Sequence, residues 1–264
     1  MNHYLFIVEG AHDVALVSSI LRVLKFKCIK NYNKINHPFN KLIIDKFPYD
    51  KSNLDIYNKL PSFYIKEDKN ICIISADGEM KLIKSLDNAV SKFRIEELDK
   101  LTKIVIFCDG DTDNRDNKIN RLIKLSFSKN NKLEINKEKL IKGYLSLNNI
   151  NMINIKSEFF VMPNNKDSGR LEHILIEAIK NVDGKLLEEV DLFLTKVPDL
   201  YKSKWSENNS KYDKTRISCV GNVKNPASSM GALIGSSKWI TEDTVRNCRL
   251  LGGIYNYIKN TLNL

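Results

Sequence analysis

Short apolar runs alternate with amphipathic segments along the first two thirds of the chain. Four of these runs are rich in Ile, Val and Phe, and polar or turn residues bound each of them: residues 4–8, 71–75, 103–108 and 158–162. A nearly continuous apolar run of this length is typical of a strand that is buried on both faces of a parallel sheet. The pattern therefore predicts four strands at the centre of the fold.

Helical periodicity follows three of the predicted strands. Apolar residues recur at spacings of three and four over residues 14–24, 80–90 and 171–179, and Ser168 is a candidate N-cap for the last of these helices. Alternation of strands and helices favours right-handed crossovers in a doubly wound sheet. We predict an α/β fold with a parallel sheet of about four strands flanked by helices.

Two stretches depart from this alternation. Residues from about 30 to 70 are rich in Asn, Lys, Tyr and Pro, which predicts a polar insertion, and the charged residues 200–214 predict a loop. Residues 227–236 and 241–262 have helical patterns. We therefore expect an α/β domain over residues 1–185 and a mainly helical C-terminal extension over residues 186–264.

Acidic residues stand at or after the end of every predicted strand. They are Glu9 and Asp13 after the first, Asp77 and Glu79 after the second, Asp109, Asp111 and Asp113 after the third, and Glu172 in the helix after the fourth. Ligands of open α/β sheets bind where the carboxyl ends of the strands meet. Carboxylates gathered there repel one another unless a cation neutralises them, and Mg²⁺ and Mn²⁺ prefer such oxygen ligands. The alternative is that each acid merely stabilises a helix N-terminus or a loop.

The net charge narrows the class of partner. Lys and Arg number 42 against 32 Asp and Glu, so the formal charge is +10 in a chain whose 42% hydrophobic residues suffice for a packed core. This excess favours a polyanion, nucleic acid before an anionic membrane, although a compositionally biased genome would also accumulate Lys. No apolar run approaches the ~18 residues of a membrane span, and Glu9 interrupts the N-terminal run, so we expect a cytoplasmic protein without a signal peptide. Five scattered cysteines argue against a disulfide scaffold or a zinc ribbon.

Other metal and phosphate motifs fit the acidic segment after the third strand less well. An EF-hand would need Gly at Asn114 and Glu at Asn120. A phosphatase of the haloacid dehalogenase type would use Asp109 as nucleophile and Asp111 as acid, but it normally carries that motif on its first strand; we keep it as a weaker alternative. The chain has no P-loop, so it is not a P-loop ATPase by itself.

Three segments together resemble the Toprim superfamily. They are the strand and helix start FIVEGAHDV at residues 6–14, the strand IVIFCDGD at residues 104–111, and MPNN followed by SGRLE at residues 162–172. The form Glu-x-x-x-Asp is most similar to the nuclease domains of overcoming-lysogenization-defect (OLD) proteins and to small stand-alone Toprim-like proteins. The resemblance covers about residues 4–180 and implies a Toprim, Rossmann-like fold.

The resemblance also implies roles for individual residues. It implies that Mg²⁺ or Mn²⁺, as two ions, binds to Glu9, Asp13, Asp109 and Asp111, with Asp113 and Glu172 as outer ligands. Glu9 is alternatively the general acid or base. OLD-type nucleases also use a basic residue late in the domain to stabilise transition-state charge. Lys224 and Lys238 are the candidates here, and we assign Lys238 to the catalytic set.

We therefore predict a metal-dependent nuclease of DNA or RNA that acts in antiviral defence or nucleic-acid repair. Two metal ions would clamp the attacking and leaving oxygens of the phosphodiester. One alternative is a non-catalytic or conditionally activated partner of an ATPase, and a weaker one is a nuclease of ribosomal RNA maturation. A homo-oligomer is compatible with each of these. Trp205 and Trp239 could stack on bases, but we favour a structural anchoring role for both.

Overall fold

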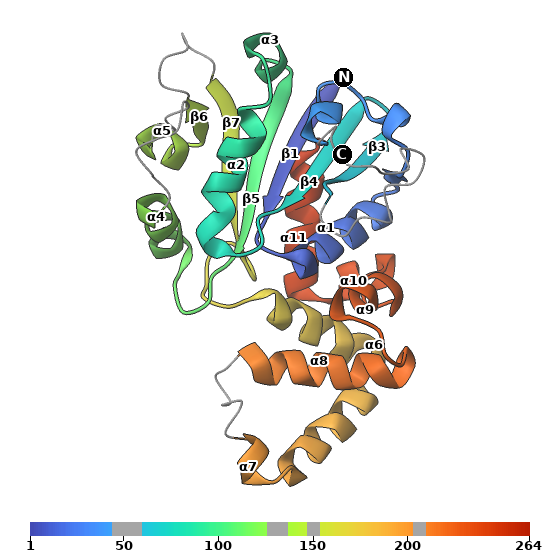
Figure 1. Cartoon of the computed structure of the whole chain (residues 1–264). Coiled ribbons are helices and arrows are strands. Elements are labelled where there is room, and N and C mark those ends of the chain that lie inside the picture. The colour runs from blue at the N-terminus through green and yellow to red at the C-terminus, as the bar shows by residue number, and fades with distance from the viewer. Residues whose placement is uncertain (44–59, 126–136, 147–153, 203–209) are drawn as a thin grey trace.

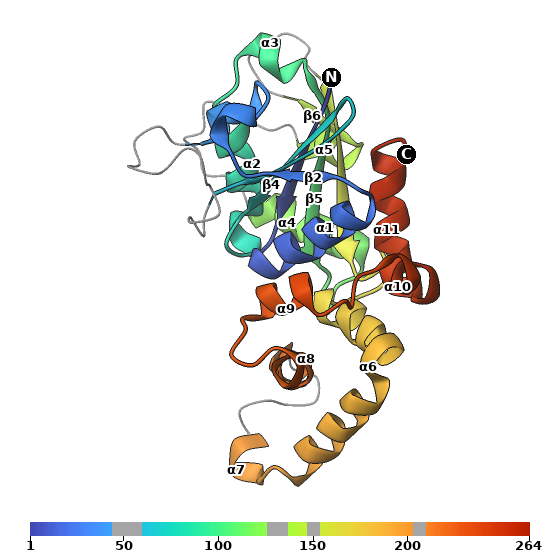
Figure 2. The same cartoon turned by 90° about the vertical axis from the view of Figure 1, so that its right-hand side faces the viewer.

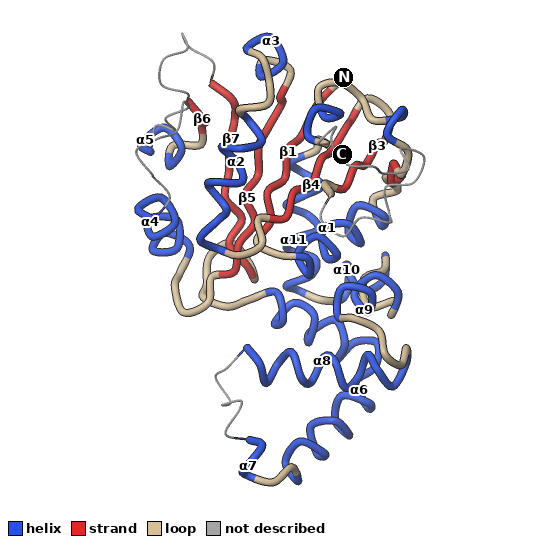
Figure 3. The backbone as a smooth tube through the Cα atoms, in the orientation of Figure 1, coloured by secondary structure: helices blue, strands red, loops and turns tan. Residues whose placement is uncertain are grey.

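The computed structural model of the protein describes residues 1–43, 60–125, 137–146, 154–202 and 210–264. In these residues one seven-stranded sheet has the strand order β2-β3-β4-β1-β5-β7-β6 (Figures 1 and 3). The strands are β1 (Asn2–Val8), β2 (Lys27–Ile29), β3 (Ser62–Lys66), β4 (Lys69–Ser75), β5 (Leu101–Asp109), β6 (Tyr144–Ser146) and β7 (Asn154–Met162).

The four predicted strands form the parallel centre of this sheet. Strand β1 pairs in parallel with β4 and β5, and β5 pairs in parallel with β7. Three antiparallel strands extend the edges, because β3 pairs with β4, β2 with β3, and β6 with β7. The α/β fold with a parallel core is confirmed. The region predicted as a polar insertion over 30–70, however, contributes β3 and the start of β4, and its residues 44–59 lie outside the described residues.

Helices cover both faces of the sheet and continue beyond its carboxyl edge. They are α1 (Ala11–Val23), α2 (Leu82–Val90), α3 (Ile95–Leu98), α4 (Arg115–Leu125), α5 (Lys137–Ile141), α6 (Leu171–Lys196), α7 (Asp199–Lys202), α8 (Ser210–Lys224), α9 (Met230–Ser236), α10 (Glu242–Asn247) and α11 (Arg249–Thr261). Short 3-10 turns span Tyr32–Lys34, Phe39–Leu42 and Glu79–Lys81. Helices α2 and α4 lie on one face, and α1 and α11 lie on the other (Figures 1 and 2). None of the helices in the described ranges is long and apolar enough to cross a membrane.

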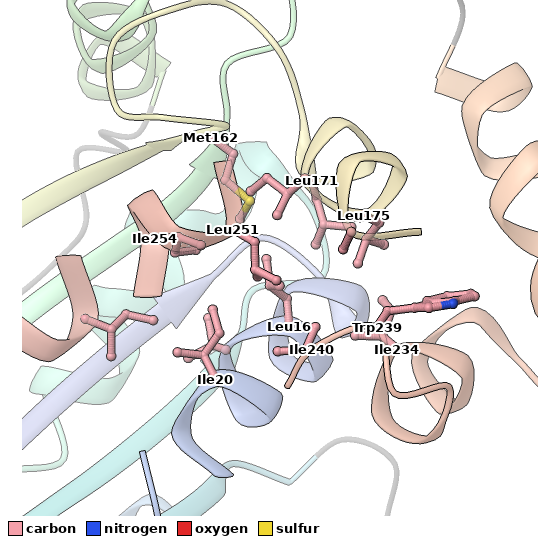
Figure 4. Packing of buried hydrophobic residues seen from close by; sticks show 14 of the residues in the cluster. Leu16, Ile20, Met162, Leu171, Leu175, Ile234, Trp239, Ile240, Leu251 and Ile254 are labelled. Atoms are coloured by element: carbon pink, nitrogen blue, oxygen red, sulfur yellow. The ribbon is translucent and has the colours of Figure 1, made fainter. Parts of the chain in front are cut away.

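Burial on alternating sides of the sheet explains why residues 4–8 of β1 are all apolar. Tyr4, Phe6 and Val8 belong to the hydrophobic cluster on the side of α1, α6 and α11. Leu5 and Ile7 belong to a second cluster on the side of α2 and α4. Burial on both faces removes the polar alternation that an open sheet would show. In the first cluster the side chains of three helices meet (Figure 4): Leu16 and Ile20 of α1, Leu171 and Leu175 of α6, and Leu251 and Ile254 of α11.

The helical predictions hold in outline and need corrections at the ends. Helix α6 begins with Arg170 as N-cap, not with Ser168. The predicted loop over 200–214 includes the end of α7 and the start of α8, whose first turns are polar and therefore lack a helical signal. The pattern over 241–262 divides into α10 and α11, because Cys248 between them has an extended backbone (φ −104°, ψ 122°).

Helix α6 bends at Asp183, whose backbone leaves the helical region (φ −128°, ψ 33°). The part of α6 beyond Asp183, together with α7 and α8, forms a helical arm that extends away from the sheet (Figure 1). The Asp183 carboxylate accepts hydrogen bonds from Trp239 Nε1 (2.8 Å) and from Lys224 Nζ (2.7 Å). Trp239 is fully buried, so it anchors the bend and cannot stack on a base. Trp205 lies outside the described residues.

Trp239→Phe is expected to lower the free energy of unfolding by about 1–3 kcal/mol, because Asp183 loses its indole donor while the ring volume is largely kept. Urea denaturation followed by circular dichroism measures this loss. Asp183→Asn tests the same contact from the other side and should also destabilise the protein. A Trp239→Phe variant with wild-type stability would show that the bend does not depend on this hydrogen bond.

Candidate active site

Carboxylates from several elements line one pocket at the carboxyl edge of the parallel strands. The pocket has a volume of about 330 Å³ and lies between the ends of β1, β4 and β5 and the N-termini of α1 and α6. We call it the carboxylate pocket. Its lining residues are Glu9, Gly10, Ala11, His12, Asp13, Asp77, Gly78, Asp109, Leu171, Glu172 and Lys214. Four of the predicted site residues, Glu9, Asp13, Asp109 and Glu172, thus lie together.

Backbone N–H groups fix three of these carboxylates. The N–H of Gly10 donates to Asp13 Oδ2 (2.7 Å), which ties the first turn of α1 to the end of β1. The N–H of Leu171, at the start of α6, donates to Asp109 Oδ1 (2.8 Å). The N–H of Asp109 donates to Glu9 Oε2 at a longer 3.3 Å. The local fold therefore brings the carboxylates together without neutralising them.

Burial and mutual repulsion raise the pKa values in the pocket. Burial, followed by the charge of Glu9, raises the pKa of Asp13 to about 7. Burial and the charges of Asp13 and Glu172 hold the pKa of Asp109 well above its usual range. Burial also raises the pKa of Glu9. Buried carboxylates that repel one another are stabilised when a proton or a bound cation neutralises part of their charge.

The oxygen atoms of the carboxylate pocket fit a divalent cation in chemical type. Glu172 is only 3% exposed, and its Oε2 is buried without a hydrogen-bond partner in the described structure. A cation would satisfy that oxygen and relieve the repulsion among the acids, and carboxylate oxygen suits Mg²⁺ or Mn²⁺. In the described ranges, no three His, Cys, Asp or Glu side chains already converge as a metal site. Binding would therefore require these carboxylates to draw closer together.

Asp111 and Asp113 are not among the residues that line the carboxylate pocket. They belong to a neighbouring group of ion pairs whose charges still act on Glu9. This ion-pair cluster consists of Glu79, Asp111, Asp113, Lys118, Arg121 and Arg170. Lys118 Nζ lies 2.9 Å from Asp111 Oδ2, and Arg121 Nε lies 3.3 Å from Asp113 Oδ2. The structure thus separates the two aspartates of the D-x-D motif, which we had expected to act together.

The two lysines singled out in the sequence lie away from the carboxylate pocket. Lys238 lines a different pocket of about 320 Å³ with Arg22 and Lys25, at the opposite end of α1 from Asp13. Lys224 binds Asp183 at the bend of α6. The lysine that does line the carboxylate pocket is Lys214, whose Nζ is 3.5 Å from Glu172 Oε1.

Sequence reasoning missed Lys214 and gave little weight to His12. Lys214 belongs to the segment predicted as a loop, and only the position of α8 against α6 brings it to the pocket. His12 lines the pocket beside Asp13. Burial, together with the nearby charge of Lys214, lowers the pKa of His12. Its place directly after Glu9-Gly10-Ala11 was a signal in the sequence, but a single histidine at a helix start is usually a polar surface residue.

Comparison with known proteins identifies a family and a fold. A family model described as "Protein of unknown function (DUF3226)" matches residues 3–249. The crystal structure of hypothetical protein PH0156 from Pyrococcus horikoshii OT3 is similar, with a TM-score of 0.55, 16% identity, and coverage of 100% of this chain and 96% of that chain. The C-terminal region of the Burkholderia pseudomallei OLD protein has a TM-score of 0.37, 13% identity and 98% coverage of both chains. No curated protein matches the sequence. The similarity to the Pyrococcus protein supports the fold alone, and the similarity to the OLD protein region is too weak to carry an argument.

Proposed function

We propose that this chain, which belongs to the DUF3226 family of proteins of unknown function, is a metal-dependent nuclease that cleaves phosphodiester bonds of DNA or RNA. One observation carries the proposal. Glu9, Asp13, Asp109 and Glu172 line a single pocket at the carboxyl edge of the sheet, in a chain whose net charge is +10. An acidic pocket in a basic protein suits a cation at the centre and a polyanion around it.

The chemistry follows from the charges in the pocket. A divalent cation held there would supply Lewis acidity to a phosphate and lower the pKa of water. Asp13, Asp109 and Glu172 would hold this cation through their carboxylate oxygens. Glu9 sits at the end of β1, where its Oε2 accepts a hydrogen bond from the N–H of Asp109 and burial raises the pKa of its carboxyl. It is therefore suited to handle the proton of the attacking or leaving oxygen.

Lys214 supplies the positive charge on the side of the substrate. Its side chain is 45% exposed, lines the pocket and faces Glu172. An ammonium group in this place can contact a phosphate oxygen as charge develops on it during the reaction. This is the role that we had assigned to Lys238, which lies in another pocket.

Lys214→Met is expected to lower kcat by about 10²–10³-fold, the range seen when one donor to developing negative charge is removed. Lys238→Met is the matched control. We expect it to keep kcat within about threefold of wild type, because Lys238 does not line the carboxylate pocket and its exposed charge is screened by solvent. Steady-state cleavage assays on both variants, with melting curves to confirm folding, make the comparison. Equal losses in the two variants would contradict the role given to Lys214.

The proposed function is tested by incubating the purified chain with plasmid, single-stranded DNA and RNA in Mg²⁺, in Mn²⁺ and in EDTA. We expect cleavage of at least one substrate with either cation and none in EDTA. The Glu9→Gln/Asp109→Asn double variant should be inactive. Cleavage only after addition of a co-purifying ATPase would favour the conditional partner. Wild type and double variant behaving alike on all three substrates, alone and with such a partner, would contradict the proposal.

A further inference from the structure

The two aspartates of the Asp109-Gly110-Asp111 turn lie in different surroundings. Asp109 lines the carboxylate pocket, whereas Asp111 contacts Lys118. We propose that Lys118 is a built-in cation that takes the place of a second metal ion at Asp111, so that the protein binds one divalent cation, on the side of Asp109. This inference rests on the proposed function and specifies the ligands of its metal site.

The ammonium group of Lys118 is buried between two carboxylates, which is the position that a bound cation would take. Its side chain, on the first turns of α4, is fully buried. Its Nζ lies 2.9 Å from Asp111 Oδ2 and 3.2 Å from Glu79 Oε2. A buried ammonium group is costly unless carboxylates pair with it, and removing one partner leaves an uncompensated charge. Asp111 is therefore committed to Lys118 by the fold.

The charges of the ion-pair cluster balance, and those of the carboxylate pocket do not. Arg121 Nη2 lies 2.9 Å from Glu79 Oε1, and Arg170 Nε lies 3.5 Å from Asp111 Oδ1. The cluster thus sets three acids (Glu79, Asp111, Asp113) against three bases (Lys118, Arg121, Arg170). The lining of the carboxylate pocket sets five acids (Glu9, Asp13, Asp77, Asp109, Glu172) against one lysine (Lys214). Of these two groups of side chains, only the carboxylate pocket has unbalanced acids that would attract a cation.

The backbone of the turn separates the two aspartates. The N–H of Gly110 donates to Met162 O (3.1 Å), and a Cβ at Gly110 would come within 2.9 Å of that same oxygen. Asp111 has a positive φ of 53°, and its N–H donates to Gly169 O (2.7 Å). Aspartate tolerates this conformation better than most residues. The turn therefore directs Asp111 toward α4 while Asp109 stays at the start of α6.

A two-metal site would need the opposite arrangement. Its ions lie about 3.5–4 Å apart and clamp two oxygens of one phosphodiester. A D-x-D motif can serve both ions only if both aspartates face the pocket. Here Lys118 already provides a positive charge at Asp111, without the need to bind an ion from solution.

Mn²⁺ binding to the full chain, measured by isothermal titration calorimetry and by electron paramagnetic resonance, tests the inference without relying on activity. We expect wild type to bind one Mn²⁺ per chain. Asp109→Asn should weaken that binding at least about a hundredfold. Asp111→Asn leaves Lys118 paired with Glu79, so it should keep the stoichiometry at one and the Kd for Mn²⁺ within about threefold of the wild-type value. These two variants are matched, because they remove the same group from the same motif. Two ions bound to wild type, or equal losses in both variants, would overturn the inference.

Lys118→Met supplies the second arm. Loss of the ammonium group leaves Asp111 and Glu79 without their shared cation, so we expect a second Mn²⁺ to bind, and the Lys118→Met/Asp111→Asn double variant to return to one. A folded Lys118→Met variant that still binds a single ion would overturn the surrogate role. If Lys118→Met does not fold, the Mn²⁺ binding of Asp109→Asn and Asp111→Asn decides whether the metal site lies on the side of Asp109 alone. Absence of any Mn²⁺ binding to wild type would instead contradict the proposed function itself.

Discussion

Asp109→Asn is expected to lower kcat/KM for metal-dependent cleavage at least about a hundredfold while the fold stays intact. The variant removes a negative charge from the most crowded part of the carboxylate pocket, where Asp13, Glu172 and Glu9 all act on Asp109. The amide oxygen of Asn can still accept the hydrogen bond from the N–H of Leu171, which keeps the start of α6 in place. Cleavage rates at saturating Mg²⁺, with far-ultraviolet circular dichroism to confirm folding, measure the effect.

Asp116→Asn is a suitable control for this experiment. Asp116 lies on α4, its side chain is 83% exposed, and it pairs with its neighbour Arg115. Exposed ion pairs of this kind contribute little to the free energy of unfolding, so the cleavage rate and the stability of Asp116→Asn should stay close to those of wild type. An Asp109→Asn variant that cleaves like Asp116→Asn would remove Asp109 from the catalytic site.

Asp13→Asn is expected to stabilise the metal-free protein at pH 8. Because the pKa of Asp13 rises to about 7 from its ordinary value of 3.8, the folded state holds a proton that the unfolded state releases between these two values. Stability from this group is therefore present at pH 4 and falls as the pH rises toward 7. Asn carries no such cost, so the Tm of Asp13→Asn should be several degrees higher than that of wild type at pH 8, and this gain should vanish near pH 4.

Melting curves in EDTA at pH 4 and pH 8 test this prediction. Melting curves with Mg²⁺ at pH 8 provide a second test. Saturating Mg²⁺ should raise the Tm of wild type at pH 8 and raise that of Asp13→Asn by less, because the variant lacks one proposed ligand and part of the repulsion that the cation relieves. Asp183→Asn gives the opposite sign at pH 8, since its carboxylate accepts hydrogen bonds from Trp239 and Lys224. An Asp13→Asn variant less stable than wild type in EDTA at pH 8 would show that the acids of the pocket do not repel one another.

The centre of the fold could be predicted from the sequence because its physical signal is strong. Double-sided burial makes β1, β4, β5 and β7 almost wholly apolar over at least part of their length, and such runs are easily recognised. Once the strands were parallel, Glu9, Asp13 and Asp109 had to approach one another at their carboxyl ends. The edge strands β2, β3 and β6 are short and mixed in character, so no periodicity marked them.

Three features of the site depend on contacts that no local pattern contains. Lys118 is buried, although lysine is among the residues least often buried, and so nothing in the sequence marked it as the partner of Asp111. Lys214 reaches the pocket only through the packing of α8 against α6. Lys238 was a plausible late basic residue, but α9 and α1 place it at the far end of α1.

The resemblance to Toprim proteins stays a prediction. The matching family model gives no function, and the structural similarity to the Pyrococcus protein extends to the fold. The motifs at Glu9 and Asp109 nevertheless fall at adjacent strand ends, as that resemblance requires. Asp111 pairs with Lys118 and is not among the residues that line the carboxylate pocket in the described structure, so its predicted role as a metal ligand stays a prediction.

A crystal structure of the protein soaked in Mn²⁺, with anomalous scattering to locate the metal, tests the central claim most directly. We expect one anomalous peak in the carboxylate pocket, within bonding distance of carboxylate oxygens of Asp109, Asp13 and Glu172, which would have drawn together around it. Lys118 should still contact Asp111. A pocket that stays free of Mn²⁺ at saturating concentration, with the carboxylates apart as they are without metal, would contradict the claim that this pocket binds the catalytic cation.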